Sequence, residues 1–303
     1  MQHIPFRPDL QGLRAIAVLL VIFAHAGIPP FSGGFIGVDV FFVLSGYLIS
    51  ALLFKELHDG ERIQLAAFYA RRLRRLLPAL LFVIISTVLA ASLLLPNTEA
   101  FGMLASTPYA ASWSSNLFFA LRDVDYFDEA ATRDLFLHTW SLGVEEHFYL
   151  VWPLVLLLLF KIARFRRGVD KVSLIRPMVI FLVLAFAFSL YLSSASTTLA
   201  FYMMPARMWE FALGALVYVL QSSMMKPSGQ AVESFVSAPR LNHKLFLWLQ
   251  AQRMVLWLGI GLLLASAMLI SDGLEHPALW AIAPTVAAAL IIFAGGGGGG
   301  GGG

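Results

Sequence analysis

The stretch LLPALLFVIISTVLAASLLL, residues 76–95, is an unbroken run of 20 residues without a charged side chain. A bilayer core about 30 Å thick needs about 20 apolar residues per helix, so this run predicts a membrane-spanning helix. The whole chain agrees, because 59% of its 303 residues are hydrophobic and only 13% are charged. Soluble domains carry about 25% charged residues. The composition therefore excludes a water-soluble fold.

Eight windows of this kind follow one another along the chain. They cover approximately residues 11–27, 36–54, 76–95, 142–160, 177–195, 205–221, 254–271 and 278–294. The runs are continuous rather than alternating, and lipid offers backbone groups no water to bind, so helices are favoured over a β-barrel. We therefore predict an all-α fold, a polytopic transmembrane helical bundle.

The positive charges predict how this bundle is oriented. Of the 21 lysines and arginines, 18 lie in the alternate segments 1–14, 55–75, 161–176 and 222–253. Cytoplasmic loops accumulate Lys and Arg, so we expect a multi-pass protein with a cytoplasmic N-terminus. The acidic segment 96–138 is then extracytoplasmic, and it is long enough that we expect it to fold over the outer face.

The net charge of +3 does not indicate a nucleic-acid partner, because the basic residues fall between apolar runs. Membrane lipid and an anionic cytosolic ligand are the expected partners. The chain has no cysteine, which excludes disulfides and thiolate metal sites. The unbroken glycine run 295–303 stops an apolar helix, and we interpret it as an artefact or placeholder. Residues 1–294 then form one transmembrane domain that is C-terminally incomplete.

Ionisable residues inside the predicted spans are candidates for function, because a charge at the bilayer centre costs at least about 2.5–3.5 kcal/mol. Arg14 and His25 are eleven residues apart, which places them near one helix face and about 16 Å apart along the axis. Such a stripe would join a cytoplasmic cation to an imidazole near the outer surface. The alternative is that Arg14 reaches lipid phosphates and His25 binds a neighbouring backbone group.

Other polar residues of the spans have structural alternatives. In HTWSLGVEEHFYLVWP, residues 138–153, Ser141 and Glu145 share a helix face, with His138 one turn earlier. Successive residues point about 100° apart, so one of Glu145 and Glu146 is expected to face the interior and the other a neighbouring helix or the interface. Hydrogen bonding between helices is the structural alternative.

Arg207 and Glu210, at i and i+3, are predicted to form an ion pair on one helix, and a structural role is the favoured interpretation. Asp39 is expected either to bind acceptor hydroxyls or, as the favoured alternative, to cap its helix. Several glycines around it predict tight turns or close helix contacts. They are Gly33, Gly34, Gly37 and Gly46.

The stretch FYARRLRRLLPAL, residues 68–80, places four arginines in a turn and a half of helix. They are Arg71, Arg72, Arg74 and Arg75. Guanidinium groups match phosphate oxygens with two parallel hydrogen bonds, so the cluster is suited to an anion. Ordinary anchoring by positive residues at the cytoplasmic surface is the alternative, which these residues alone favour.

Five sequence blocks, in this order, resemble a known family. They are RPDLQGLRAIAVLLVIFAHAG, GGFIGVDVFFVLSGYLIS, FYARRLRRLLPAL, HTWSLGVEEHFYLVWPL and FYMMPARMWEFALGAL, between residue 6 and about residue 220. They are similar to the acyltransferase family 3 membrane proteins of the bacterial inner membrane. The resemblance implies transfer of an acyl group, usually acetyl, from cytosolic acyl-coenzyme A to a hydroxyl of a cell-envelope glycan. That glycan is a lipopolysaccharide O-antigen, a peptidoglycan or an exopolysaccharide.

The resemblance also implies an arrangement and a set of site residues. Family members typically have ten helices, of which eight are visible here, and some add a C-terminal SGNH hydrolase-like domain that this chain does not contain. The residues implied for acyl-coenzyme A are Arg14, Arg71, Arg72 and Arg75. Those implied for catalysis are His25, Glu145 and Glu146. The candidate substrate contacts are Asp39, Ser141, Arg207 and Glu210. Relatives typically carry glutamine where this chain has His147, and no metal site is predicted.

These residues suggest a mechanism. Coenzyme A is polyanionic, so its nucleotide end is expected to stay at the cytoplasmic arginines while its pantetheine arm enters the bundle. His25 is predicted to be the general base for the acceptor hydroxyl, with Glu145 or Glu146 orienting it. An acyl-histidine intermediate is the competing version. The rival function is a transporter or flippase of an envelope precursor, which would also place charges inside a helical bundle.

Overall fold

The structure is a computed structural model that describes residues 7–60, 63–128, 131–167, 171–224, 239–270 and 277–296. The described residues form helices and connecting turns, with no strand among them. The long helices are α1 (Pro8–His25), α2 (Gly37–Gly60), α3 (Leu65–Leu94), α7 (Trp140–Arg167), α8 (Lys171–Ala195), α10 (Met204–Met224), α12 (Pro239–Leu269) and α14 (Ile282–Gly295). The short ones are η1 (Ser32–Ile36), α4 (Asn97–Met103), α5 (Thr107–Ala111), α6 (Ser115–Leu121), η2 (Ala131–Arg133), η3 (Leu137–Thr139), α9 (Thr197–Tyr202) and α13 (Pro277–Trp280).

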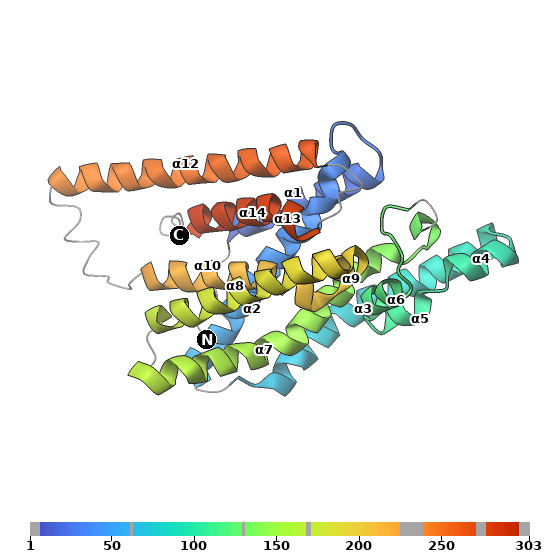
Figure 1. The fold of residues 1–303 in the computed structure, drawn as a ribbon, viewed down its shortest axis with the longest axis horizontal. Coiled ribbons are helices and arrows are strands. Elements are labelled where there is room, and N and C mark those ends of the chain that lie inside the picture. The colour runs from blue at the N-terminus through green and yellow to red at the C-terminus, as the bar shows by residue number, and fades with distance from the viewer. Residues whose placement is uncertain are drawn as a thin grey trace.

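Each of the eight predicted windows corresponds to a long helix. In the described part of the chain, seven helical spans are long and apolar enough to cross a membrane, which confirms the polytopic helical bundle. The remaining window is α10, which packs against both α2 and α8 in the bundle (Figure 1) and buries most of its side chains. Protein rather than lipid surrounds α10. This position lowers the cost of the charges that it carries.

Glycines set the closest helix contacts. A Cβ atom at Gly46 of α2 would collide with the backbone of Phe211, and one at Gly214 of α10 would collide with the backbone of Val43. Small residues let two helix backbones approach in this way in membrane proteins. Gly34 and Gly37 lie against the backbone of α1 for the same reason. The close-contact interpretation of these glycines is therefore confirmed.

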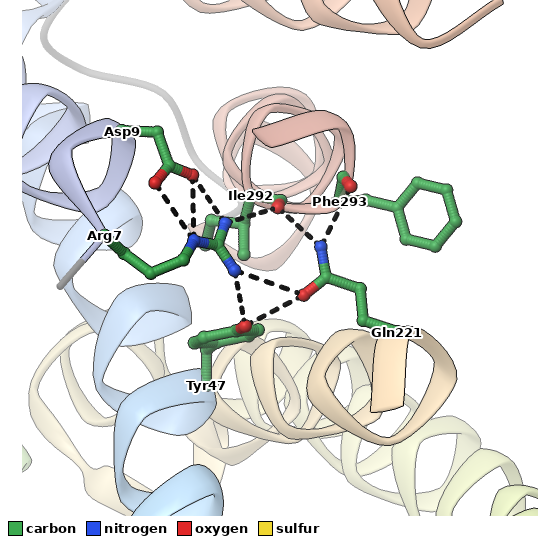
Figure 2. Close-up of polar contacts among 6 residues, drawn as sticks. All are labelled: Arg7, Asp9, Tyr47, Gln221, Ile292 and Phe293. Carbon is green, nitrogen blue, oxygen red and sulfur yellow. Dashed lines mark hydrogen bonds and ion pairs between the residues drawn. The ribbon is translucent and has the colours of Figure 1, made fainter. Parts of the chain in front are cut away.

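The start of α1 is tied to three other helices through Arg7 (Figure 2). Its guanidinium donates to the Asp9 carboxylate at 2.5–3.2 Å, to the Tyr47 hydroxyl at 2.7 Å, to Gln221 Oε1 at 3.5 Å and to the Ile292 carbonyl at 3.1 Å. Gln221 in turn donates to the Ile292 carbonyl at 2.8 Å. We call these five residues the Arg7 clamp. It joins α1 to α2, α10 and α14, and so holds α1 in position along its axis.

The segment between α3 and α7 lies at the opposite end of α1 from the Arg7 clamp. It contains α4, α5, α6, η2 and η3, and Figure 1 shows α4, α5 and α6 near one another at the right of the view. α5 packs against α3, and α6 packs against α7 and α9. The segment therefore has the folded structure that its length predicted, and it contributes side chains to the site described next.

Candidate active site

His25 is the last residue of α1, and its ring has a defined orientation. The Nδ1 atom lies 2.8 Å from the Val21 carbonyl oxygen, and the Nε2 atom lies 3.2 Å from the Tyr126 hydroxyl. A carbonyl oxygen can only accept, so Nδ1 is the nitrogen that carries the proton in the neutral ring. The lone pair is then on Nε2. The Tyr126 hydroxyl donates to it, and His25 as a whole is exposed.

His25 opens onto a cavity of about 720 Å³ that we call the His25 cleft. Its walls come from the end of α1, the turn that follows it and the segment before α7. The polar side chains that line it are His25, Ser32, Tyr126, Thr132, Asp134 and His138. Asp134 is held in place, because it accepts from the Ser106 hydroxyl at 2.5 Å and from the Phe136 amide at 2.9 Å. Burial raises the pKa of the Asp134 carboxyl, and these hydrogen bonds act in the opposite direction.

A second, smaller cavity adjoins this cleft. It has a volume of about 60 Å³, and we call it the Arg207 chamber. Its lining residues are Phe35, Ile36, Val38, Asp39, Tyr126, Phe127, Trp140, Phe201, Arg207, Ile270, Pro277, Trp280 and Ala281. Three of these, Phe35, Tyr126 and Phe127, also line the His25 cleft. The two cavities are therefore neighbours, and Tyr126, the residue that contacts His25, lines both.

The charges of the chamber belong to a buried group on α2 and α10. Arg207 forms ion pairs with Asp39 and, at 2.9 Å between Nε and Oε1, with Glu210. The predicted pair on α10 is confirmed, and Asp39 joins it instead of serving only as a helix cap. Arg207 Nε and both Glu210 carboxylate oxygens have no aligned hydrogen bond, so the second pair is close in distance only. This group has one cation for two carboxyls.

The two adjacent glutamates of α7 do face different surroundings, as their spacing predicts. Glu145 accepts hydrogen bonds from Ser45 of α2 and from Tyr149 of its own helix. Glu146 is half-buried, and its Oε1 atom has no partner. Val21 and Tyr126 are the residues that orient His25. The prediction that Glu145 or Glu146 orients His25 is therefore wrong for this structure.

The four arginines of the α3 cluster lie in different surroundings. Arg71 pairs with Glu56 of α2, and the Arg72 guanidinium lies 3.7 Å from the centre of the Tyr149 ring. Arg74 and Arg75 are exposed. Arg72 is thus turned toward the helix that carries the two glutamates, whereas Arg75 is accessible to a ligand.

Arg14 is half-buried on α1, which is an unbroken helix between Arg14 and His25. The two residues therefore share a face, about 16 Å apart, as predicted. Arg14 does not line either of the two cavities that share Tyr126. A continuous passage from Arg14 to His25, which the predicted mechanism requires, is therefore not formed by these cavities.

Two further residues of the α7 motif have local partners. The Ser141 hydroxyl donates to the His138 carbonyl at 3.4 Å, so it does not share a contact with Glu145. The Nδ1 atom of His147 lies 3.4 Å from the side-chain nitrogen of Asn116 in α6. Within the described ranges, no group of three or more His, Asp or Glu side chains has the arrangement of a metal site.

Sequence reasoning named only His25 and His138 among the polar residues that line the His25 cleft. Tyr126 and Asp134 lie in the acidic segment 96–138, which has so many polar residues that none of them stands out. His138 was noted only for its position one turn before Ser141. The contact between Tyr126 and His25 joins positions 101 residues apart. A search for tyrosine or histidine near the ends of predicted spans would have selected His138, but not its partnership with His25 in one cavity.

This helical bundle, with an oriented imidazole at the edge of a large cleft, defines an integral membrane protein with a site suited to acid-base chemistry. The chain belongs to an acyltransferase family, because the model of that family's acyltransferase domain matches residues 7–301. Three relatives from Staphylococcus aureus, the O-acetyltransferase OatA of strains NCTC 8325, COL and MRSA252, are each 44% identical over 151 residues.

The match to these relatives covers 50% of this chain and 25% of each OatA. The chain thus spans a minor part of the length of the curated relatives that it matches. No solved structure matches the chain. The family resemblance of the five sequence blocks is confirmed, and the activity of the whole protein is treated below.

Proposed function

We propose that the protein is a membrane O-acyltransferase of the bacterial inner membrane, with its N-terminus in the cytoplasm. It takes an acyl group, acetyl in the simplest case, from cytosolic acyl-coenzyme A and transfers it to a hydroxyl of a cell-envelope glycan. The observation that carries this proposal is the Nε2 atom of His25, which faces a cleft of about 720 Å³. Membership of an acyltransferase family and similarity to proteins named O-acetyltransferase support it.

The acceptor is proposed to bind in the His25 cleft. That cleft is large enough for a sugar unit, since pockets for small ligands measure about 300–1,000 Å³. Its hydroxyl and carboxylate groups, from Ser32, Tyr126, Thr132 and Asp134, are of the kinds that bind sugar hydroxyls. A lipopolysaccharide O-antigen, a peptidoglycan or an exopolysaccharide would each present such hydroxyls.

The reaction needs one proton transfer in each direction. The acceptor hydroxyl takes the place of the Tyr126 hydroxyl at His25 Nε2. Nε2 then takes the acceptor's proton while the acceptor oxygen bonds to the thioester carbonyl carbon. The carbon–sulfur bond then breaks, and the thiolate leaves with the proton from Nε2, so that free coenzyme A and an ester are formed. The bond from Nδ1 to the Val21 carbonyl keeps the ring in the required tautomer throughout.

The donor is proposed to bind at the exposed arginines of α3. Arg75 is exposed and available to a phosphate of coenzyme A. Arg71 would exchange its partner Glu56 for a phosphate, and Arg72, which lies over Tyr149, would direct the donor toward α7. Glu145 joins α7 to α2 through Ser45, and Glu146, whose Oε1 atom has no partner, is the carboxylate available for catalysis.

Transfer of radiolabel from acetyl-coenzyme A to envelope glycan, measured in membranes, tests this function. The variant His25→Ala is expected to lose transfer by about 100- to 10,000-fold, the usual contribution of a general base. His147→Gln is the matched control, because this histidine contacts Asn116 outside the cleft, and it is expected to stay active. Full activity of His25→Ala excludes the proposed role of His25. No transfer by the unaltered protein excludes the function.

The same membranes separate the two chemical routes. An acyl-histidine intermediate would leave radiolabel on the protein when acetyl-coenzyme A is supplied without glycan. Direct transfer with His25 as general base leaves the protein unlabelled under these conditions. The orientation of His25 Nε2 toward the cleft is compatible with both routes.

A further inference from the structure

The size of the Arg207 chamber restricts what can occupy it. A water molecule needs about 10–15 Å³ of such volume, so about 60 Å³ holds roughly four to six water-sized groups. An acetyl group, with a methyl carbon, a carbonyl carbon and an oxygen, is within this size. A sugar unit, which has about eleven heavy atoms, exceeds it.

The walls of the chamber are aromatic and mutually packed. Ring centres lie 5.0 Å apart between Phe35 and Phe127, 5.0 Å between Tyr126 and Phe201, and 4.5 Å between Trp140 and Phe201. Packed rings form a rigid apolar surface that favours a small apolar group.

Arg207 faces this apolar chamber together with Asp39, its ion-pair partner, which also lines the chamber. Arg207 is 4% exposed, and its pairs with Asp39 and Glu210 fix it before any ligand arrives. It is the single lysine or arginine among the residues that line the chamber. A guanidinium that is already held in place can donate a hydrogen bond to a carbonyl oxygen on which negative charge develops, because no reorganisation is needed at that moment.

The position of the chamber next to the His25 cleft also supports a role in acyl transfer. The two cavities share Tyr126, whose hydroxyl lies 3.2 Å from His25 Nε2. A group in the chamber and an acceptor in the cleft would therefore both lie beside Tyr126, the residue that contacts the base. A cavity for an unrelated lipid tail would need no connection to this point.

We infer that the Arg207 chamber is the acyl-binding subsite, that it sets the length of the transferred acyl chain, and that Arg207 faces the carbonyl oxygen. This inference rests on the proposed function. The chamber holds the two-carbon acetyl group, and each added methylene must find room against the wall that Trp280 and Ala281 form.

Trp280 and Ala281 provide the test. Trp280 is 44% exposed, so Trp280→Ala enlarges the chamber without opening the bundle core, whereas Ala281→Leu fills it. Transfer rates are measured in membranes with acetyl-, propionyl- and butyryl-coenzyme A. Their ratio does not depend on how much folded protein is present, which makes it robust to losses in folding.

Trp280→Ala is expected to raise the ratio of butyryl to acetyl transfer about tenfold, since each buried methylene changes a rate by roughly fourfold. Ala281→Leu is expected to lower acetyl transfer at least tenfold without changing the KM for glycan. Trp257→Ala is the matched control, because this tryptophan of α12 is 68% exposed and lines neither cavity.

The outcomes separate the two proposals. If the unaltered protein transfers no acyl group from any donor, both the function and the subsite are excluded. If it transfers acetyl, but Trp280→Ala keeps the same butyryl-to-acetyl ratio as the control, only the acyl subsite is excluded. A chamber that holds a lipid tail predicts that second result.

Discussion

Arg7 and Arg207 lie in regions of opposite character. Each of the five N–H groups of Arg7 has an acceptor, and the clamp joins four helices. Arg207 is more deeply buried, but two carboxyls hold it with imperfect alignment, and it lines a cavity. Fully satisfied hydrogen bonds are the mark of a structural contact, whereas buried polar atoms without partners require another explanation. The comparison supports the proposal that Arg7 serves stability and that Arg207 binds a ligand.

The largest expected effect comes from breaking the Arg207 group. Arg207→Met leaves Asp39 and Glu210 buried without a cation, which is expected to lower the free energy of unfolding by about 3–5 kcal/mol. The triple variant that adds Asp39→Asn and Glu210→Gln removes all three charges and is expected to recover most of this loss. Acyl transfer is not expected to recover. Thermal unfolding and transfer are measured on the same purified sample, and a triple variant with normal transfer would show that the group is structural only.

Arg7→Ala is expected to lower the free energy of unfolding by about 1.5–3 kcal/mol, because hydrogen bonds of a charged group are lost. Transfer per folded molecule should change less than threefold, since the clamp lies at the far end of α1 from His25. The control is Arg253→Ala on the exposed side of α12, which should change stability by about 0.5 kcal/mol or less. An Arg7 variant that unfolds at the normal temperature but transfers nothing would reverse the comparison.

Arg75→Ala is expected to raise the KM for acetyl-coenzyme A by about 10- to 100-fold, the value of one lost charged hydrogen bond to phosphate. Arg74→Ala removes the same charge from the same exposed helix but points about 100° away, so its effect should stay below threefold. Steady-state kinetics at saturating glycan give both values. Equal effects of the two variants would indicate a general charge effect at the membrane surface, not a defined phosphate contact.

The smallest expected effect is that of Tyr126→Phe, which removes the hydroxyl that His25 Nε2 contacts. The loss of one neutral hydrogen bond is expected to lower kcat by about 2- to 10-fold with little change in either KM. Tyr109→Phe, in the same segment but outside both cavities, is the control. If the kcat of the Tyr126 variant equals that of the control, Tyr126 is a wall residue without influence on the base.

The sequence predicted the helices better than the site. Long apolar runs must be helical in lipid, because every backbone group needs a partner within its own segment, so the windows matched the helices. The family blocks also located His25 and Arg207 in advance. The partners of these residues could not be predicted, since Tyr126 and Asp39 are 101 and 168 positions away from them.

What the sequence determined by itself are the local relations: the helical spans, the shared face of Arg14 and His25, and the ion pair of Arg207 with Glu210. Each depends only on the 3.6-residue period of one helix. The tertiary structure alone decided that Asp39 joins this pair, that Arg72 lies over Tyr149, and that Tyr126, which contacts His25, lines two neighbouring cavities. These features depend on which faces of different helices meet, and side-chain packing between helices sets that choice, not the pattern within any one of them.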